Sequence, residues 1–238
     1  MAELLRGAPV AASLTEELSY RTRALRSRGI EPTLAIVRVG ERSDDLAYER
    51  GALKRAERVG LTVQRVLLPA DCAQEDLIAA IERVNADASV HGCLMFSPLP
   101  PHLDEAAARA TLNASKDVDG ITPGSLFGLY AREAVGFAPC TAEAVVELLD
   151  RSGVALEGSR VCVVGRSLVI GRPVSLMLQD RNATVTMCHT RTRNLAEECR
   201  RADVLVVARP GARRDGDAGG GGILPLRGGS GAVAAVLG

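Results

Sequence analysis

Apolar runs of strand length alternate with amphipathic helical stretches through the first part of the chain. Helices are predicted at residues 13–28, 43–59 and 74–86, and strands at residues 34–39, 62–68 and 90–96. Ser43 is expected to cap the second helix. Because buried strands that alternate with helices form parallel sheets covered on both faces, this part is expected to be an α/β domain over residues 1–140.

The same alternation restarts near residue 140. Helices are predicted at residues 141–151, from Gly171 onward and at 194–201, and strands at 161–165, 183–187 and 203–208. This β-α-β-α-β order is that of one mononucleotide-binding half of a Rossmann domain. The predicted fold is therefore α/β with two domains, each a parallel-type sheet flanked by helices, the second over residues 141–238 being Rossmann-like.

The pattern stops after Pro210. The run from Gly211 to Gly222 contains many glycines and charged residues, which bury no apolar face and carry high backbone entropy. Only residues 232–237 have the apolar content of a further strand. The second domain is therefore expected to be incomplete, with an irregular Gly-rich tail from about residue 210.

The composition limits the kinds of partner that this protein is expected to bind. Lys and Arg together number 29, equal to Asp and Glu, so the formal net charge is zero and nothing favours binding of nucleic acid. No apolar run approaches the roughly 20 residues that span a bilayer, so no membrane partner is expected. The six cysteines form no Cys-x-x-Cys pair, which disfavours a metal site and fits a reducing compartment. A cytoplasmic protein is predicted.

A glycine-containing loop joins the predicted strand 161–165 to the next helix. Glycine lets backbone amides approach a phosphate, and a helix N-terminus favours negative charge. The spacing differs from Gly-x-Gly-x-x-Gly, so a tight turn without a ligand stays open as an alternative. The candidate cofactor-binding residues in this loop are Gly165, Arg166, Ser167 and Gly171.

The end of the following strand indicates which dinucleotide is preferred. NAD-binding folds usually place an acidic residue there, about 20 residues after the Gly-rich turn. This chain has Thr190 and Arg191 instead, with Arg166 in the first turn. Cations and hydroxyls suit a 2′-phosphate, so NADP is the predicted cofactor and Thr190 a further candidate ligand. The alternative is that these arginines belong to a solvated loop.

A loop with two carboxylates, Lys116-Asp117-Val118-Asp119-Gly120, precedes the second domain. By itself it could bind a metal or a heterocycle, or be an Asp-rich turn. In combination with other segments, however, it resembles the methylenetetrahydrofolate dehydrogenase/cyclohydrolase family over roughly residues 4–208. The matching segments are Val90 to Pro100, Lys116 to Gly120, Pro139-Cys140-Thr141, Gly165 to Pro173 and Ala183 to Thr190.

The resemblance implies a function and a set of roles. It implies NADP-dependent oxidation of 5,10-methylenetetrahydrofolate in one-carbon metabolism, with the folate bound by residues 1–140 and a homodimer as the assembly. Tyr48 would pack against the folate and Asp119 would bind the pterin ring, which makes these two the catalytic candidates. Pro98 and Leu99 of the Pro-Leu-Pro loop would complete the substrate site.

Two departures from the family concern the hydrolysis step. The position of the family's lysine, four residues after Tyr48, holds Ala52, and the position of its glutamine holds Phe96. Lys54 lies at i+6 from Tyr48 and so points to a different side of the helix. Since adding water to the methenyl cation requires a positioned acid or base, dehydrogenase activity is expected without efficient cyclohydrolase activity. The alternative is an impaired paralogue that binds folate or NADP without turnover.

Overall fold

The computed structural model describes residues 3–208 and the backbone of residues 233–237. The chain divides into two compact units, one of residues 11–138 and one of residues 1–10 together with 139–238. The division near residue 139 lies within two residues of the expected boundary. The first ten residues, however, join the second unit, because a short strand near the N-terminus pairs with the strand at the C-terminus.

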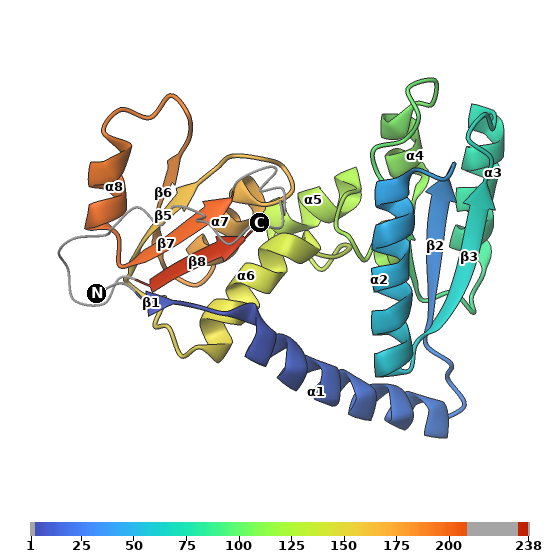
Figure 1. The fold of residues 1–238 in the computed structure, drawn as a ribbon, viewed down its shortest axis with the longest axis horizontal. Helices are drawn as coiled ribbons and strands as arrows, with labels where there is room; N and C mark the ends of the chain where they lie inside the picture. Colours follow the sequence, from blue (N-terminus) through green and yellow to red (C-terminus); the bar gives the residue numbers. More distant parts are fainter. Residues whose placement is uncertain (1–2, 209–232, 238) are drawn as a thin grey trace. The chain divides into compact units, whose positions relative to one another are not determined.

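The unit of residues 11–138 contains a parallel sheet of three strands. The strands β2 (Thr33–Val39), β3 (Thr62–Leu68) and β4 (Gly92–Met95) lie in the order β3-β2-β4. The connections are α2 (Ser43–Val59) and α3 (Gln74–Ala86), in agreement with the predicted ranges. Figure 1 shows α2 on one side of this sheet and α3 on the other.

The two faces of this sheet are packed differently. Ala35, Val37 and Val39 of β2 belong to an apolar core with the buried side chains of α3. On the opposite face Arg38 is buried, and its Nε donates to Glu49 of α2 at 2.8 Å. Arg65 of β3 donates to the other oxygen of Glu49 at 2.5 Å, so the buried carboxylate has a guanidinium on each oxygen. Such pairing is what allows charged groups to be buried under α2.

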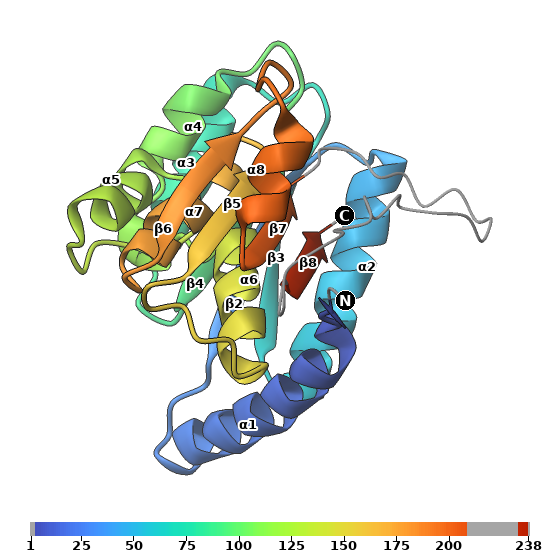
Figure 2. The same ribbon diagram turned by 90° about the vertical axis from the view of Figure 1, so that its left-hand side faces the viewer.

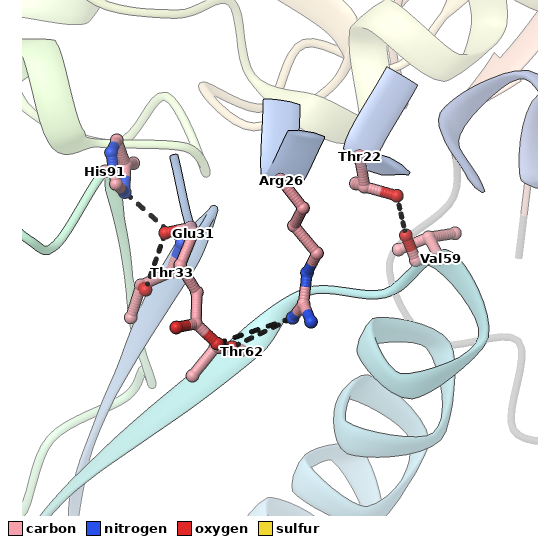
Figure 3. Close-up of polar contacts among 7 residues, drawn as sticks. All are labelled: Thr22, Arg26, Glu31, Thr33, Val59, Thr62 and His91. Carbon is pink, nitrogen blue, oxygen red and sulfur yellow. Dashed lines mark hydrogen bonds and ion pairs between the residues drawn. The ribbon is translucent and has the colours of Figure 1, made fainter. Parts of the chain in front are cut away.

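The helix α1 (Gly7–Ser27) is connected to the amino ends of the strands (Figure 3). Thr22 Oγ1 donates to the Val59 carbonyl oxygen at 2.5 Å, and Arg26 Nη2 donates to Thr62 Oγ1 at 3.2 Å. The helix begins six residues before the predicted start. Neither it nor any other helix in the described residues is both long and apolar enough to cross a bilayer.

Short elements after β4 were missing from the sequence prediction. They are α4 (Glu105–Thr111), the 3-10 helix η1 (Ala114–Lys116) and α5 (Pro123–Ala131). Each begins with a side-chain cap, from Asp104, Asn113 and Thr122 respectively. With seven, three and nine residues, these helices are too short for a strong apolar periodicity, so the caps and the Pro at the start of α5 were the available signals.

The second unit contains a five-stranded parallel sheet in the order β1-β8-β7-β5-β6. Its strands are β1 (Glu3–Leu4), β5 (Arg160–Val164), β6 (Thr184–Cys188), β7 (Val204–Ala208) and β8 (Val233–Leu237). The predicted strand at 232–237 is therefore present as β8. The third strand of the β-α-β-α-β segment, β7, lies beside β5 and not beside β6, which is the 2-1-3 order of doubly wound sheets and not the 3-2-1 order of a Rossmann half.

Helices cover both faces of this sheet. Buried side chains of α6 (Cys140–Arg151) and α7 (Gly171–Gln179) pack against Val161, Val163, Val204 and Val206. The other face packs under α8 (Leu195–Arg201), which is in front of the sheet in Figure 2. That smaller core contains three buried cysteines, Cys162, Cys188 and Cys199, and burial raises the pKa of the Cys162 and Cys199 thiols.

Candidate functional site

A pocket of about 330 Å³ lies at the carboxyl ends of β2 and β4. In parallel sheets this edge is where ligands bind, because the connecting loops gather there. Its wall combines aromatic, aliphatic and charged side chains. The lining residues are Arg42, Asp44, Asp45, Tyr48, Leu94, Met95, Phe96, Ser97 and Asp119. The two residues predicted to be catalytic, Tyr48 and Asp119, thus meet in one pocket although 71 positions separate them in the sequence.

Tyr48 and Phe96 form an aromatic pair at this pocket. Their ring centroids are 5.3 Å apart at an interplanar angle of 70°, an edge-to-face arrangement. Phe96 is buried, whereas Tyr48 is 54% exposed and so has surface available for a ligand. Ala52, one helical turn after Tyr48, is half-buried and does not belong to the pocket lining. The positions at which the family carries a lysine and a glutamine are therefore apolar here.

The loop that carries Asp119 is anchored by its neighbour Asp117. Asp117 is fully buried, and its Oδ2 accepts hydrogen bonds from Thr122 N and Ser125 Oγ, each at 2.7 Å. Lys116 Nζ donates to the carbonyl oxygens of Val84 and Asp87 at 2.7 and 2.6 Å. The backbone is thus held on both sides of Asp119, which is half-buried at the pocket wall.

The two loop residues predicted to bind substrate, Pro98 and Leu99, are placed differently from each other. Leu99 is 8% exposed and its side chain belongs to the main apolar core, while its amide donates to Glu105 Oε2 at 2.8 Å. Pro98 is exposed, and its carbonyl oxygen accepts a hydrogen bond from Arg42 Nη1 at 3.0 Å. Neither residue lines the pocket. Their position next to Phe96 and Ser97 puts them at its border.

Sequence reasoning missed the charged residues Arg42, Asp44 and Asp45 of this pocket. They follow directly after β2, at the start of α2. A signal was present, because polar residues at the carboxyl end of a buried parallel strand are candidates for ligand binding. Because Ser43 was expected to cap the helix, this segment was assigned a structural role only.

A second pocket of about 500 Å³ lies at the carboxyl ends of β5, β6 and β7. It opens at the point where the strand order reverses, between β5 and β7, which is the usual dinucleotide position in doubly wound sheets. Its apolar floor is shared with the core under α8. The lining residues are Val164, Gly165, Arg166, Ser167, His189, Thr190, Leu195, Val207 and Ala208. Four of the five predicted cofactor residues are among them, and Gly171 is not.

The glycines of this loop are required by close backbone contacts. A Cβ on Gly165, whose φ is +132°, would lie 2.3 Å from the Ala208 carbonyl oxygen. A Cβ on Gly171 would lie 2.3 Å from the Gly165 carbonyl oxygen. Gly171 is buried at the first turn of α7, so it affects the conformation of the loop without lining the pocket. The two glycines keep the loop tight against the ends of β5 and β7.

The Ser167 hydroxyl accepts hydrogen bonds from two backbone amides near the start of α7. These are the amides of Ile170 at 3.1 Å and Gly171 at 3.4 Å. Its own hydroxyl proton is then available to an acceptor in the pocket. Arg166, next in the chain, is exposed at the pocket mouth. A hydroxyl donor and a guanidinium side by side are suited to phosphate oxygens.

His189 and Thr190 belong to a tight turn after β6. His189 Nδ1 accepts from the Arg191 amide at 3.1 Å, and Thr192 Oγ1 accepts from the His189 amide at 2.8 Å. These contacts give His189 a structural role in the turn, although it also lines the pocket. His91 likewise accepts from the Thr33 amide at 3.3 Å (Figure 3). Arg191 is exposed but does not line the pocket, whereas Thr190 does.

Together these features define an α/β protein with a dinucleotide-type pocket in one unit and a polar, aromatic pocket for a small molecule in the other. Comparison with known proteins identifies the family. Residues 5–119 match the catalytic domain, and residues 139–213 the NAD(P)-binding domain, of tetrahydrofolate dehydrogenase/cyclohydrolase. The chain belongs to this family.

Individual relatives agree with the assignment. The bifunctional protein FolD of Carboxydothermus hydrogenoformans is 49% identical over 208 residues, which are 87% of this chain and 72% of that protein. The crystal structure of the bifunctional enzyme FolD from Campylobacter jejuni superimposes with a TM-score of 0.83 at 36% identity, covering 87% of this chain and 74% of that one. The Trypanosoma brucei enzyme, solved with NADP cofactor and inhibitor, gives a TM-score of 0.79 at 36% identity and covers 87% and 71%.

Proposed function

We propose that this chain oxidises 5,10-methylenetetrahydrofolate to 5,10-methenyltetrahydrofolate with NADP as the hydride acceptor. The observation that carries the proposal is the meeting of Tyr48 and Asp119 in one pocket. Both were assigned to the folate from separate sequence motifs, and both belong to the part of the chain that matches the catalytic domain of the family. Two of the relatives named above, the enzymes from C. jejuni and T. brucei, are methylenetetrahydrofolate dehydrogenases/cyclohydrolases by name, which supports the same chemistry here.

The reaction moves a hydride, with its electron pair, from the methylene carbon of the substrate and leaves a cation shared between the two flanking nitrogens. NADP supplies the hydride acceptor when bound. The protein's task is to orient the substrate and to stabilise the developing positive charge. Tyr48 offers an aromatic face, Asp119 accepts hydrogen bonds from the pterin, and the carboxylate of Asp44 on the same wall favours a cation.

The preference for NADP rests on the residues of the second pocket. Arg166, Ser167 and Thr190 line it and supply a guanidinium and two hydroxyls. None of the described residues that line it is acidic, so a carboxylate to hold the ribose 2′-hydroxyl of NAD is missing there. The solved relative from T. brucei contains NADP, in keeping with this preference.

The proposed second step, hydrolysis of the methenyl product, is expected to be slow in this chain. Water that attacks the methenyl carbon must lose a proton to a positioned base. The two polar family positions are occupied by Ala52 and Phe96, and the Phe96 ring packs against Tyr48. Lys54 is exposed on another side of α2 and does not line the pocket. We therefore expect the methenyl product to persist.

The test is an absorbance assay with purified protein, 5,10-methylenetetrahydrofolate and NADP. Formation of NADPH together with a lasting methenyl signal is the expected result. A methenyl signal that appears and then decays faster than in buffer would show efficient hydrolysis. That result would refute the expectation that hydrolysis is slow in this chain. Absence of both signals, with thermal stabilisation by folate or NADP retained, would favour the alternative of an impaired binding protein.

Two further features are proposed from the family relationship. The chain is proposed to form a homodimer, which light scattering after size-exclusion chromatography would test. It is proposed to act in the cytoplasm, with support from six cysteines that are all outside disulfides. A monomer at micromolar concentration would contradict the first proposal, and secretion into an oxidising compartment the second.

A further inference from the structure

We infer that Arg42 is a positioning residue that fixes the substrate loop after β4 against the start of α2. This inference rests on the proposed function, since it treats the pocket with Tyr48 and Asp119 as the folate site. It adds a residue that no sequence motif indicated. The argument follows from where Arg42 lies in its helix, what its guanidinium contacts and which charges surround it.

Arg42 occupies the N-cap position of α2, where an arginine is unfavourable. Its backbone is extended, with φ −61° and ψ 140°, and it makes no side-chain cap. N-caps favour Ser, Thr, Asp or Asn, and the positive end of the helix dipole disfavours a cation. The expected cap, Ser43, is instead the first residue of the helix. Departures from local preference of this kind are expected mainly at functional sites.

The guanidinium of Arg42 bridges two segments that border the pocket. Nη1 donates to the Pro98 carbonyl oxygen at 3.0 Å, and Nη2 donates to Asp45 Oδ1 at 3.1 Å. Asp45 is 8% exposed, so its carboxylate is a firm anchor within the first turn of α2. One side chain thereby joins the loop after β2 to the loop after β4 over 56 positions of sequence. Lysine could not hold both acceptors with the same planar geometry.

Arg42 also balances part of the negative charge in the pocket wall. Among the described residues that line this pocket, Arg42 is the cation, and Asp44, Asp45 and Asp119 are anions. Ala52 contributes no charge where the family has a lysine. Removing Arg42 would leave the buried Asp45 carboxylate without its guanidinium and the Pro98 carbonyl without its donor. The loop would then be free to shift, and the substrate would meet a less ordered wall.

The decisive experiment compares the wild type with Arg42→Ala, Arg42→Lys and a control, Arg50→Ala. Arg50 lies on the same helix, is exposed and does not line the pocket. Loss of hydrogen bonds to a charged donor corresponds to about 10-fold to 100-fold in binding, and the partial exposure of Arg42 favours the lower end. We expect Arg42→Ala to raise KM for 5,10-methylenetetrahydrofolate about 10-fold, with kcat within about 3-fold.

The controls separate positioning from general damage. KM for NADP is expected to stay unchanged in all variants, Arg42→Lys to recover part of the folate KM, and Arg50→Ala to resemble the wild type. A fall in kcat with unchanged folate KM, an equal rise in KM for NADP, or a lysine variant no better than alanine would overturn the proposal.

Hydrogen exchange provides a readout that needs no turnover. The loop of residues 97–103 has backbone amides at Ser97, Leu99, His102 and Leu103, its other residues being prolines. These amides are expected to exchange faster in Arg42→Ala than in the wild type and in Arg50→Ala, because the loop has lost a hydrogen bond that holds it. Unchanged exchange there would refute the positioning role whether or not the enzyme is active. If the wild type shows no turnover but the exchange difference is present, the proposed reaction fails while the positioning role stands.

Discussion

The two units of this protein build their sites on the same sheet topology but from different chemical groups. In both, the first strand of a β-α-β-α-β segment lies in the middle, with the second and third strands on either side, as β3-β2-β4 and β6-β5-β7. In both, the pocket lies at the carboxyl ends of these strands. The topology therefore fixes where a site forms and leaves its chemistry to the loops.

The loops differ because the ligands differ. The pocket of residues 11–138 is walled by side chains, including Tyr48, Asp119 and Arg42, which can recognise a flat heterocycle with specific donors. The loop of the second unit depends on Gly165 and Gly171, whose missing side chains permit its close approach to β7. Backbone amides and a helix N-terminus suit a phosphate, which needs no shape-specific side chain. Substitutions should therefore act differently in the two units.

The largest effect is expected from a methyl group in the glycine loop. In Gly171→Ala the new Cβ would lie 2.3 Å from the Gly165 carbonyl oxygen, so the loop must move. We expect destabilisation of about 2–4 kcal/mol and at least tenfold weaker NADP binding, from overpacking and backbone displacement. Thermal unfolding and an NADP titration measure the two effects.

A matched control for that substitution is Gly153→Ala. Gly153 has φ +70° but open space around its Cβ position, so only the left-handed backbone strain of about 1 kcal/mol applies. Its NADP affinity should equal that of the wild type. Gly171 has no positive φ, so a loss of NADP affinity of the same size in Gly153→Ala would mean that the close contact in the loop does not explain the effect.

The neighbouring carboxylates Asp117 and Asp119 should separate stability from function. Asp119→Asn is expected to lower kcat/KM for the folate by about 100-fold with little change in stability, because it loses a charged acceptor at the pocket wall. Asp117→Asn is expected to destabilise the protein by about 2–3 kcal/mol, since a buried acceptor of two hydrogen bonds is replaced by a group that is partly a donor. Chemical denaturation measures the stability of both variants, and steady-state kinetics measures their kcat/KM. A greater loss of stability in Asp119→Asn than in Asp117→Asn would contradict the prediction.

Cofactor preference should respond to Arg166 while the glycine loop stays intact. Arg166→Gln is expected to lower the preference for NADP over NAD by about tenfold or more, because a charge-assisted contact with the 2′-phosphate is lost. The measurement is kcat/KM for both cofactors. A change of equal size with NAD would show that Arg166 serves the shared part of the dinucleotide instead.

A smaller effect is expected from restoring polar groups at the two apolar family positions. The double variant Ala52→Lys with Phe96→Gln should hydrolyse methenyltetrahydrofolate faster than the wild type, by about tenfold, because a general acid or base returns to the pocket. The rate of loss of methenyl absorbance measures this. If neither the double variant nor the wild type hydrolyses it, the missing lysine is not the limiting defect.

The smallest effect concerns the thiols. Burial, and next the nearby Asp117 charge, raise the pKa of Cys93 from 9.0 to about 12, so it stays protonated at pH 8. Alkylation at pH 8 should therefore modify the exposed Cys140 first, with little labelling at the buried Cys93.

Because Cys93 holds its proton to higher pH in the folded state than in the unfolded state, its contribution to stability is complete below pH 9 and is lost as the pH rises toward 12. Peptide mapping and urea melts at several pH values test both statements.

Much of the fold followed from local pattern. The ranges of β3, α2 and α3 agree with the predicted ones, because each has a clear apolar period and a glycine or polar boundary. The candidate residues Tyr48, Asp119, Gly165, Arg166, Ser167 and Thr190 were assigned from motifs, and each lines a pocket. Leu99 was assigned to the substrate by the same motif reasoning, yet its side chain packs in the core.

The sequence by itself determined the longer helices, most of the strands and the motif residues, because these depend on neighbours within a few positions. It did not determine β1 or the short helices α4, η1 and α5. The tertiary structure alone decided the strand order, the pairing of β1 with β8 and the bridge from Arg42 to Pro98. These join segments far apart in the chain, and no local period encodes which distant partner a strand edge or a guanidinium will meet. The site in residues 11–138 is of this second kind, since its wall exists only once β2 and β4 lie side by side.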